Sequence, residues 1–420
     1  MNVRIKKGLL KGTINVPSSK SLTHRAIIAA SLANGKSIIK NINKSKDIEA
    51  TISAMKHLGA KISESDNELI IEGCYPHLVN NVIDSNESGS TIRFLIPLSL
   101  LQDKEVTFIG HNKLVDRPQD VYLDIFKEKG IWYKKDNNHY LPLTVRGPIK
   151  GGIYNIRGDV SSQFITGLLY TLPLCKEDSE IRITTKLESK SYIDLTIDVL
   201  KKFGIEIKYD NNIYYIKGSQ TYQPTNYTVE GDFSQAAFFL ASDMLGSFVR
   251  LKNMNPDSLQ GDKEIINYIE RIGGKVIYKD SLYYCVSGKT NNVDIDVSNT
   301  PDLGPILTCL LSQVEGKSTL YNASRLRIKE CDRITCVKEE LIKLGLDISE
   351  TYDSIIINGK KKVNGATIDS HNDHRLVMSF AILATISESD VVITNAEAIN
   401  KSYPNFFKDF ESLGGNIIYE

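Results

Sequence analysis

The chain has 420 residues, of which 41% are hydrophobic and 24% charged. This composition is typical of a folded protein with a large buried core and room for two or three domains. Its 51 basic and 51 acidic residues balance, which argues against a nucleic-acid partner or a membrane surface. No apolar run approaches the roughly 18 residues that span a bilayer, and no apolar segment follows the charged start of the chain. We therefore expect neither a membrane span nor a secretory signal.

The cysteines show no CxxC spacing, so we interpret them as reduced, mostly packed thiols of a cytoplasmic protein and expect no zinc site. They are Cys74, Cys175, Cys285, Cys309, Cys331 and Cys336.

A similar short sequence pattern with a glycine occurs six times along the chain, at Gly59, Gly130, Gly204, Gly273, Gly345 and Gly414. The interval is about 70 residues, longer than the unit of most solenoid repeats. A unit of this length has room for two helices and several strands. The period therefore predicts six copies of one α/β unit in a closed, symmetric enzyme scaffold.

Each repeat is expected to contain a helix, a strand, a second helix that ends at the marker glycine, and a β-hairpin. The first helices begin at Ser19–Ser21, Ser88–Ser90, Ser161–Gln163, Asp232–Ser234, Pro301–Leu303 and Asn372–His374. Five amphipathic second helices are predicted over Ile48–Leu58, Val121–Lys129, Leu195–Phe203, Ile265–Ile272 and Val337–Leu344. Each marker glycine then serves as a left-handed C-cap.

A polar, proline-containing stretch, Tyr222–Asn226, indicates a domain boundary after the third repeat. We expect one domain over 19–228 and a second formed by 1–18 with 229–420, each with three repeats. The strand expected over Leu10–Val16 would complete the second domain.

Three of the first helices carry cations in their first turns, at Lys20 with Arg25, at Arg93 and at Arg375. A cation there opposes the helix dipole, unless an anion binds the free N–H groups of the same helix end. The alternative is accidental surface charge, with the small polar residues acting as ordinary N-caps.

The fifth helix start differs, because the acid Asp302 follows a proline there whereas three of the other starts carry cations, and this makes Asp302 the candidate base. Arg327–Arg333 is dense in charge and is either a solvated helix entry or an anion site with Glu330 as proton carrier. In His371–Arg375 two histidines suggest a metal, but without further ligands an anion clamp at Arg375 is the preferred interpretation.

Six motifs, in order over nearly the whole chain, resemble the 5-enolpyruvylshikimate-3-phosphate synthase family. They are Pro17–Arg25, Gly89–Arg93, Val160–Phe164, Glu230–Asp232, Lys329–Arg333 and Asn372–Arg375. The resemblance implies a monomeric, two-domain inside-out α/β barrel with three copies of one folding unit in each domain. It also implies an active site in the cleft between the domains.

By this resemblance, the enzyme moves the enolpyruvyl group of phosphoenolpyruvate to the 5-hydroxyl of shikimate 3-phosphate, in the pathway to chorismate and the aromatic amino acids. No cofactor or metal is implied. The residues implied to bind phosphoenolpyruvate are Lys20, Gly89, Arg117, Gln163, Arg333, Arg375 and Lys401. Those implied to bind shikimate 3-phosphate are Lys20, Ser21, Arg25, Ser161, Ser162, Gln163, Ser189, Tyr192, Asp302 and Lys329. Asp302 takes the hydroxyl proton, while Glu330 and Lys20 handle proton delivery to the methylene carbon.

Two features depart from the family pattern. Glu87-Ser88 stands where the family commonly has Asn-Ala or Asn-Ser, and Ser90 replaces the usual threonine. Both lie beside Gly89, so we expect them to bear on the affinity for phosphoenolpyruvate and for the inhibitor glyphosate.

Two alternative functions stay open from the sequence. The related enolpyruvyl transferase that acts on UDP-N-acetylglucosamine typically has Lys-Asn in the first motif and a reactive loop cysteine, whereas this chain has Lys20-Ser21 and no comparable cysteine loop. A non-catalytic anion-binding scaffold would not need Asp302 and Glu330 among its cations.

Overall fold

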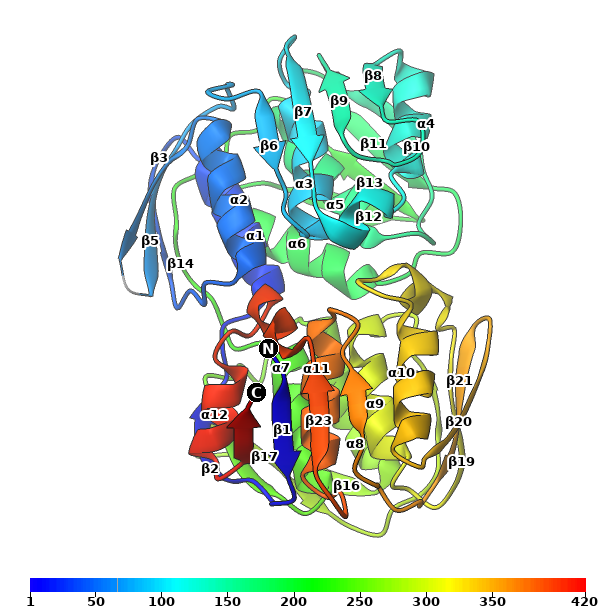
Figure 1. Ribbon diagram of the computed structural model, residues 1–420. Coiled ribbons are helices and arrows are strands. Elements are labelled where there is room, and N and C mark those ends of the chain that lie inside the picture. Colours follow the sequence, from blue (N-terminus) through cyan, green and yellow to red (C-terminus); the bar gives the residue numbers. More distant parts are fainter. Residues whose placement is uncertain (66) are drawn as a thin grey trace. The chain divides into compact units, whose positions relative to one another are not determined.

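The computed structural model describes residues 1–65 and 67–420. The chain divides into two compact units: Lys20–Val229, here called the N-terminal unit, and Met1–Ser19 with Glu230–Glu420, here called the C-terminal unit. Each unit has its own hydrophobic core. Helices alternate with small sheets throughout both units (Figure 1), as expected for the α/β class.

The first repeat shows the pattern that the others follow. It contains α1 (Lys20–Leu32), β3 (Gly35–Lys40), α2 (Lys46–His57), β4 (Lys61–Ser65) and β5 (Glu68–Gly73). The remainder of the N-terminal unit consists of β6 (Val82–Asp84), α3 (Gly89–Ser99), β7 (Glu105–Ile109), η1 (Asn112–Asp116), α4 (Asp120–Lys129), β8 (Trp132–Lys135), β9 (Leu143–Arg146), β10 (Gly152–Ile156), α5 (Ser162–Thr171), η2 (Leu172–Leu174), β11 (Ser179–Ile183), α6 (Lys190–Lys202), β12 (Ile207–Asp210), β13 (Ile213–Ile216) and β14 (Asn226–Thr228).

The C-terminal unit repeats the same order of elements. It consists of β1 (Val3–Lys6), β2 (Lys11–Asn15), α7 (Phe233–Met244), β15 (Phe248–Lys252), η3 (Gly261–Glu264), α8 (Ile265–Ile272), β16 (Gly274–Lys279), β17 (Leu282–Ser287), β18 (Asp294–Asp296), η4 (Pro301–Leu303), α9 (Gly304–Leu311), β19 (Gly316–Tyr321), η5 (Ser324–Ile328), α10 (Arg333–Lys343), β20 (Asp347–Thr351), β21 (Ser354–Gly359), β22 (Thr367–Asp369), α11 (His374–Ala384), β23 (Val391–Thr394), η6 (Ala396–Lys401), α12 (Phe406–Ser412) and β24 (Asn416–Tyr419).

The described strands form six four-stranded sheets of one topology, three in each unit. In the sheet β6-β7-β9-β8, for example, β6 and β7 are parallel and the other neighbours are antiparallel. Residues alternate between buried and accessible along the strands, as at Val106 and Phe108 of β7, so each sheet packs one face against helices.

The first helices of the repeats form the interior. In α1 every residue from Leu22 to Leu32 is buried, and in α7 all 12 residues are. A helix buried all round belongs to the core, and in the C-terminal unit α7, α9 and α11 contact one another. With helices inside and sheets outside, the structure confirms the predicted inside-out α/β fold.

The ends of the chain segments complete the sheets. β2 pairs in parallel with β15, and β1 lies between β23 and β24, so the first residues of the chain belong to the C-terminal unit. β14, at the end of the third repeat, pairs in parallel with β3 of the first. Beside the point where the chain leaves the C-terminal unit, the N–H of Ser19 donates to the carbonyl of Glu230.

All six marker glycines have positive φ, from 67° at Gly130 to 111° at Gly273, which confirms their predicted left-handed conformation. Two second helices begin earlier than predicted, α6 at Lys190 rather than Leu195 and α10 at Arg333 rather than Val337. Their first turns are rich in polar residues, so the apolar pattern alone places the starts too late.

Within residues 1–65 and 67–420 the longest helices have 13 residues, and none qualifies as a membrane-spanning segment. The six cysteines are free thiols, and all but Cys74 are buried.

Two marker glycines of the C-terminal unit allow a matched test. A Cβ at Gly273 would lie 2.1 Å from the carbonyl oxygen of Lys289, whereas no atom of the described residues lies within 4 Å of a Cβ at Gly414. Gly414→Ala is expected to lower the free energy of unfolding by about 1 kcal/mol, through its left-handed backbone alone. Gly273→Ala should cost on the order of 3 kcal/mol, because the backbone must also shift. Urea denaturation followed by circular dichroism measures both, and equal losses would contradict the role of the Lys289 contact.

Candidate active site

Arg25 contacts two other predicted site residues, Ser21 and Tyr192, at the starts of α1 and α6. Its guanidinium donates to Thr196 Oγ1 at 2.8 Å, to the Ser21 carbonyl at 2.8 Å and to the Tyr192 carbonyl at 2.9 Å. These acceptors are neutral and the side chain is buried, so burial lowers the pKa of Arg25. A buried guanidinium with neutral partners favours an anionic ligand.

Lys20, the first residue of α1, is paired. Its Nζ lies 2.8 Å from Asp47 Oδ2 in the first turn of α2, and both side chains are mostly buried. The sequence did not single out Asp47, since 26 residues separate the two positions and Asp47 looks like an ordinary acidic first turn.

Arg93 lies at the first turns of α3 and supports Gln163 of α5. Its guanidinium donates to Gln163 Oε1 at 2.8 Å and to the Pro118 carbonyl at 2.9 Å. The amide nitrogen of Gln163 in turn donates to Ser90 Oγ at 2.9 Å. We therefore interpret Arg93 as a residue that positions Gln163, rather than as the direct anion ligand suggested by its place in the sequence.

Gly89 and Arg117 are brought together. A Cβ at Gly89 would lie 2.7 Å from Arg117 Nη1, so the glycine leaves room for the guanidinium over the start of α3. Arg117 Nε is buried and has no hydrogen-bond partner among the described residues. The two neighbouring helix starts are capped, α3 by Ser88 and α5 by Ser161, and Ser162 is the first residue of α5.

Ser189 has a strained backbone. It is buried at the start of α6 with φ of 53° and ψ of 40°, a left-handed conformation unusual for serine. Within the described residues its side chain does not cap α6. Such outliers persist where the surrounding structure enforces them and often lie at ligand sites.

In the C-terminal unit, three cations contact the carboxylate of Asp302. Arg333 Nη1 lies 2.9 Å from Oδ1, Lys329 Nζ 3.3 Å from Oδ1, and Arg375 Nη2 3.2 Å from Oδ2. The four residues come from the starts of η4, α10 and α11 and from the turn before α10.

The cations decide the charge of this carboxylate. Burial acts to raise the pKa of Asp302, but Lys329, Arg375 and Arg333 together hold it well below its usual value. Burial lowers the pKa of Lys329 to about 8, against the opposing effect of Asp302. At neutral pH Asp302 is therefore an anion among cations.

Arg333 is almost fully buried and reaches two further carboxylates. Its Nε lies 2.7 Å from Asp373 Oδ2, and its Nη2 lies 2.8 Å from Glu330 Oε2. Asp373 is the N-cap of α11 and accepts from the backbone N–H of Arg375. The sequence suggested Asp373 only as a support for Arg375; its pairing with Arg333 across 40 residues had no local signal.

Lys401, the last residue of η6, is buried and donates from Nζ to the Asn372 carbonyl at 2.7 Å. It thus lies beside the turn that precedes Arg375. Among the described residues, no group of three or more His, Cys, Asp or Glu side chains is arranged to hold a metal ion.

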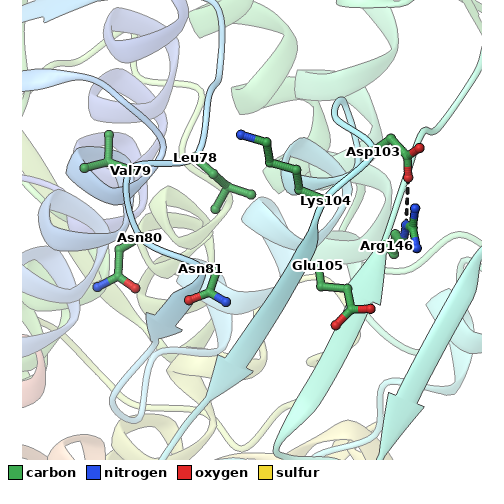
Figure 2. A pocket seen from close by; sticks show the side chains of 8 residues that line it. All are labelled: Leu78, Val79, Asn80, Asn81, Asp103, Lys104, Glu105 and Arg146. Atoms are coloured by element: carbon green, nitrogen blue, oxygen red, sulfur yellow. Dashed lines mark hydrogen bonds and ion pairs between the residues drawn. The ribbon is translucent and has the colours of Figure 1, made fainter.

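A separate pocket of about 580 Å³ in the N-terminal unit is lined by Leu78–Asn81, Asp103–Glu105 and Arg146 (Figure 2). Arg146 pairs with Asp103 at 2.7 Å. In the part of the chain that the structure describes, none of the predicted site residues lines this pocket.

The fold and these clusters define an α/β protein of six repeated units that brings cations and a half-buried carboxylate together at its helix starts. Comparison with known proteins gives the family. Residues 5–410 match the model of the family described as EPSP synthase (3-phosphoshikimate 1-carboxyvinyltransferase).

The chain is similar over nearly its whole length to proteins of that name. It is 50% identical to the 3-phosphoshikimate 1-carboxyvinyltransferase of Clostridium novyi, with 99% of this chain and 98% of the relative covered, and 44% identical to that of Clostridioides difficile, with the same coverage. Among solved structures it resembles an EPSP synthase from Acinetobacter baumannii, with a TM-score of 0.82, 25% identity and 99% of each chain covered. The chain belongs to the EPSP synthase family, and the family and enzyme class predicted from the motifs are confirmed.

The pairing of Arg333 with Asp373 can be tested by stability. Arg333→Met leaves the fully buried Asp373 without its cation and is expected to cost about 3–5 kcal/mol of unfolding free energy. The double variant with Asp373→Asn should recover part of this loss, because asparagine removes the buried charge and still caps α11.

Urea denaturation provides the measurement. Arg4→Met is the control, since Arg4 pairs with Glu420 at the surface of the same unit and its replacement should change the unfolding free energy little. A double variant less stable than Arg333→Met would show that charge pairing is not the basis of this contact.

Proposed function

We propose that this chain transfers the enolpyruvyl group of phosphoenolpyruvate to the 5-hydroxyl of shikimate 3-phosphate and releases phosphate. The observation that carries the proposal is a half-buried carboxylate, Asp302, held ionised by three cations in a family of this activity. The free, mostly buried cysteines further support action in a reducing compartment such as the cytoplasm.

Shikimate 3-phosphate is assigned to the cluster around Arg25 and to the Asp302–Lys329 pair. The positive charge of Arg25 is not offset by the neutral oxygens to which its guanidinium donates. We expect the phosphate of shikimate 3-phosphate to be bound by side chains and N–H groups at helix starts, where anions bind favourably. The assigned residues are Lys20, Ser21, Arg25, Ser161, Ser162, Gln163, Ser189, Tyr192, Asp302 and Lys329.

Phosphoenolpyruvate carries a phosphate and a carboxylate, and both suit arginine. Arg117 offers a buried Nε with no partner among the described residues, directly over Gly89. The assigned residues are Lys20, Gly89, Arg117, Gln163, Arg333, Arg375 and Lys401. The proposed reaction therefore needs residues of both units.

The reaction is proposed as addition followed by elimination. In the addition, the 5-oxygen bonds to C2 of phosphoenolpyruvate, its proton passes to Asp302, and a proton from Glu330 or Lys20 converts the methylene carbon into a methyl group. The tetrahedral intermediate then returns a proton from that methyl group to the residue that delivered it, and the C2–O bond to phosphate breaks. The enol ether forms, and the departing phosphate takes up the proton held by Asp302.

Anion binding strengthens the base in this proposal. A carboxylate with a strongly lowered pKa is a weak base, and Asp302 is weak because Lys329, Arg333 and Arg375 surround it. When phosphate and carboxylate groups of the substrates offset these cations, the pKa of Asp302 rises toward its ordinary value. The base therefore gains strength only when both substrates are bound, and the cations stabilise the charge that develops afterwards.

Of the alternatives, the scaffold does not account for the ionised Asp302, and the enzyme acting on UDP-N-acetylglucosamine is not favoured by relatives of 44–50% identity that bear the other name.

Phosphate release with each acceptor tests the proposal. With phosphoenolpyruvate, turnover is expected with shikimate 3-phosphate and not with UDP-N-acetylglucosamine; the reverse pattern, or no turnover with either, would overturn it.

Asp302→Asn should lower kcat by about 10²–10⁴-fold while shikimate 3-phosphate still binds, as calorimetry would show. Asp280→Asn, in an exposed turn of the same unit, is the matched control and should leave kcat unchanged.

The pKa of Lys329 predicts an alkaline limit. Because burial lowers this pKa to about 8, the side chain loses its charge above that pH, and kcat/KM for shikimate 3-phosphate should fall with an apparent pKa near 8. Arginine stays charged at this position, so the Lys329→Arg variant should have a kcat/KM below that of the wild type but constant to about pH 10. If kcat/KM of the variant still fell near pH 8, Lys329 would not be the source of the alkaline limit.

A further inference from the structure

The turn before α11 has an unusual backbone. Two consecutive residues, His371 and Asn372, have positive φ values of 50° and 55°. This left-handed conformation is uncommon for residues other than glycine, although asparagine and histidine adopt it more readily than most, and Asn211–Asn212 forms a similar pair. At the turn before α11, side-chain contacts from neighbouring elements also fix the backbone.

This turn places groups that the proposed reaction uses. The Asn372 carbonyl accepts from Lys401 Nζ at 2.7 Å. Directly after it, Asp373 caps α11 and lies 2.7 Å from Arg333. The backbone at 371–372 is therefore linked directly to Lys401 and, through Asp373, to Arg333.

Glu340 of α10 contacts His371, the first residue of this turn. Its side chain is 2% exposed, and its Oε1 lies 2.9 Å from His371 Nε2. Its Oε2 accepts from the backbone N–H of Asp369 at 3.0 Å and from Lys343 Nζ at 2.7 Å. The backbone N–H of His371 donates to Asp369 Oδ1 at 2.8 Å.

Glu340 thus bonds both to the end of β22 and to the left-handed turn. It is anchored independently of His371, because Lys343 lies on the same helix. A buried carboxylate with an ammonium partner is a fixed reference point, and the imidazole N–H that meets it fixes the ring of His371.

We propose that Glu340 and His371 form a positioning pair for the enolpyruvyl transfer. The pair does not touch the reactants: Glu340 acts through His371, His371 through the left-handed turn, and the turn through Lys401 and Asp373. The inference rests on the proposed function to the extent that Lys401 and Arg333 bind phosphoenolpyruvate. It assigns a role to two residues outside the set of predicted site residues.

The test compares His371→Leu with His371→Gln. Leucine removes the donor to Glu340, whereas glutamine keeps an N–H at a similar reach, and neither is β-branched. His371→Leu is expected to raise KM for phosphoenolpyruvate about 10–100-fold, since small misplacements of binding groups cost this much. KM for shikimate 3-phosphate and the melting temperature should change little, and His371→Gln should restore most of the loss.

The matched control is His57→Leu, at the exposed end of α2, where Nδ1 lies 3.0 Å from the Val82 carbonyl. This variant should keep both KM values. Equal KM values in His371→Leu and the wild type, or a failure of His371→Gln to rescue, would overturn the proposal. A loss accompanied by a large drop in melting temperature in both variants would show a structural role alone.

A second readout does not depend on turnover. Competitive acetylation of lysines, followed by mass spectrometry, reports the accessibility and bonding of Lys401, which is 6% exposed. The rate at Lys401 relative to exposed Lys360 should rise several-fold in His371→Leu and not in His371→Gln. An unchanged acetylation rate at Lys401 would contradict the positioning role, whether or not the proposed reaction is correct. The phosphate-release assay of the wild-type enzyme tests the reaction separately.

Discussion

The ionised carboxylate of Asp302 is the constraint on which the C-terminal unit depends. Burial opposes its charge, and the contacts with Lys329, Arg333 and Arg375 reverse that effect. Because Arg333 also pairs with Asp373, which caps α11, the same network joins the starts of three elements. The electrostatics that keep Asp302 charged therefore also set the local geometry, and a ligand that offsets the cations changes both.

Arg25 and the arginines of the C-terminal unit differ in the charge of their partners. In the C-terminal unit the arginines at the helix starts contact carboxylates, so any anionic ligand would compete with those carboxylates. In the N-terminal unit Arg25 meets neutral oxygens, and its charge stays available for a ligand. The cluster around Arg25 thus has an uncompensated positive charge, which suits retention of a phosphate. The cluster around Asp302 has cations paired with carboxylates, which suits a reaction in which charge is redistributed.

The sequence predicted what depends on local pattern. Marker glycines such as Gly273 and caps such as Ser161 follow from backbone and hydrogen-bond requirements that neighbouring residues reveal. The starts of α6 and α10 were placed too late because their first turns are polar. Pairings such as Lys20 with Asp47 and His371 with Glu340 join residues far apart in sequence, and the packing of helices against one another creates them. Motif resemblance predicted the site residues, whereas their contact partners became visible only in the structure.

The most direct test is the pKa of the Asp302 carboxyl with and without bound anions. Carbon-13 NMR of aspartate-labelled protein, with the signal assigned through Asp302→Asn, provides the measurement. Without ligands we expect no titration near the ordinary value of 3.8, down to the lowest pH at which the fold persists. With shikimate 3-phosphate and an unreactive analogue of phosphoenolpyruvate bound, the pKa should move upward. An ordinary or raised pKa without ligands, or no shift on binding, would contradict the role of the cations.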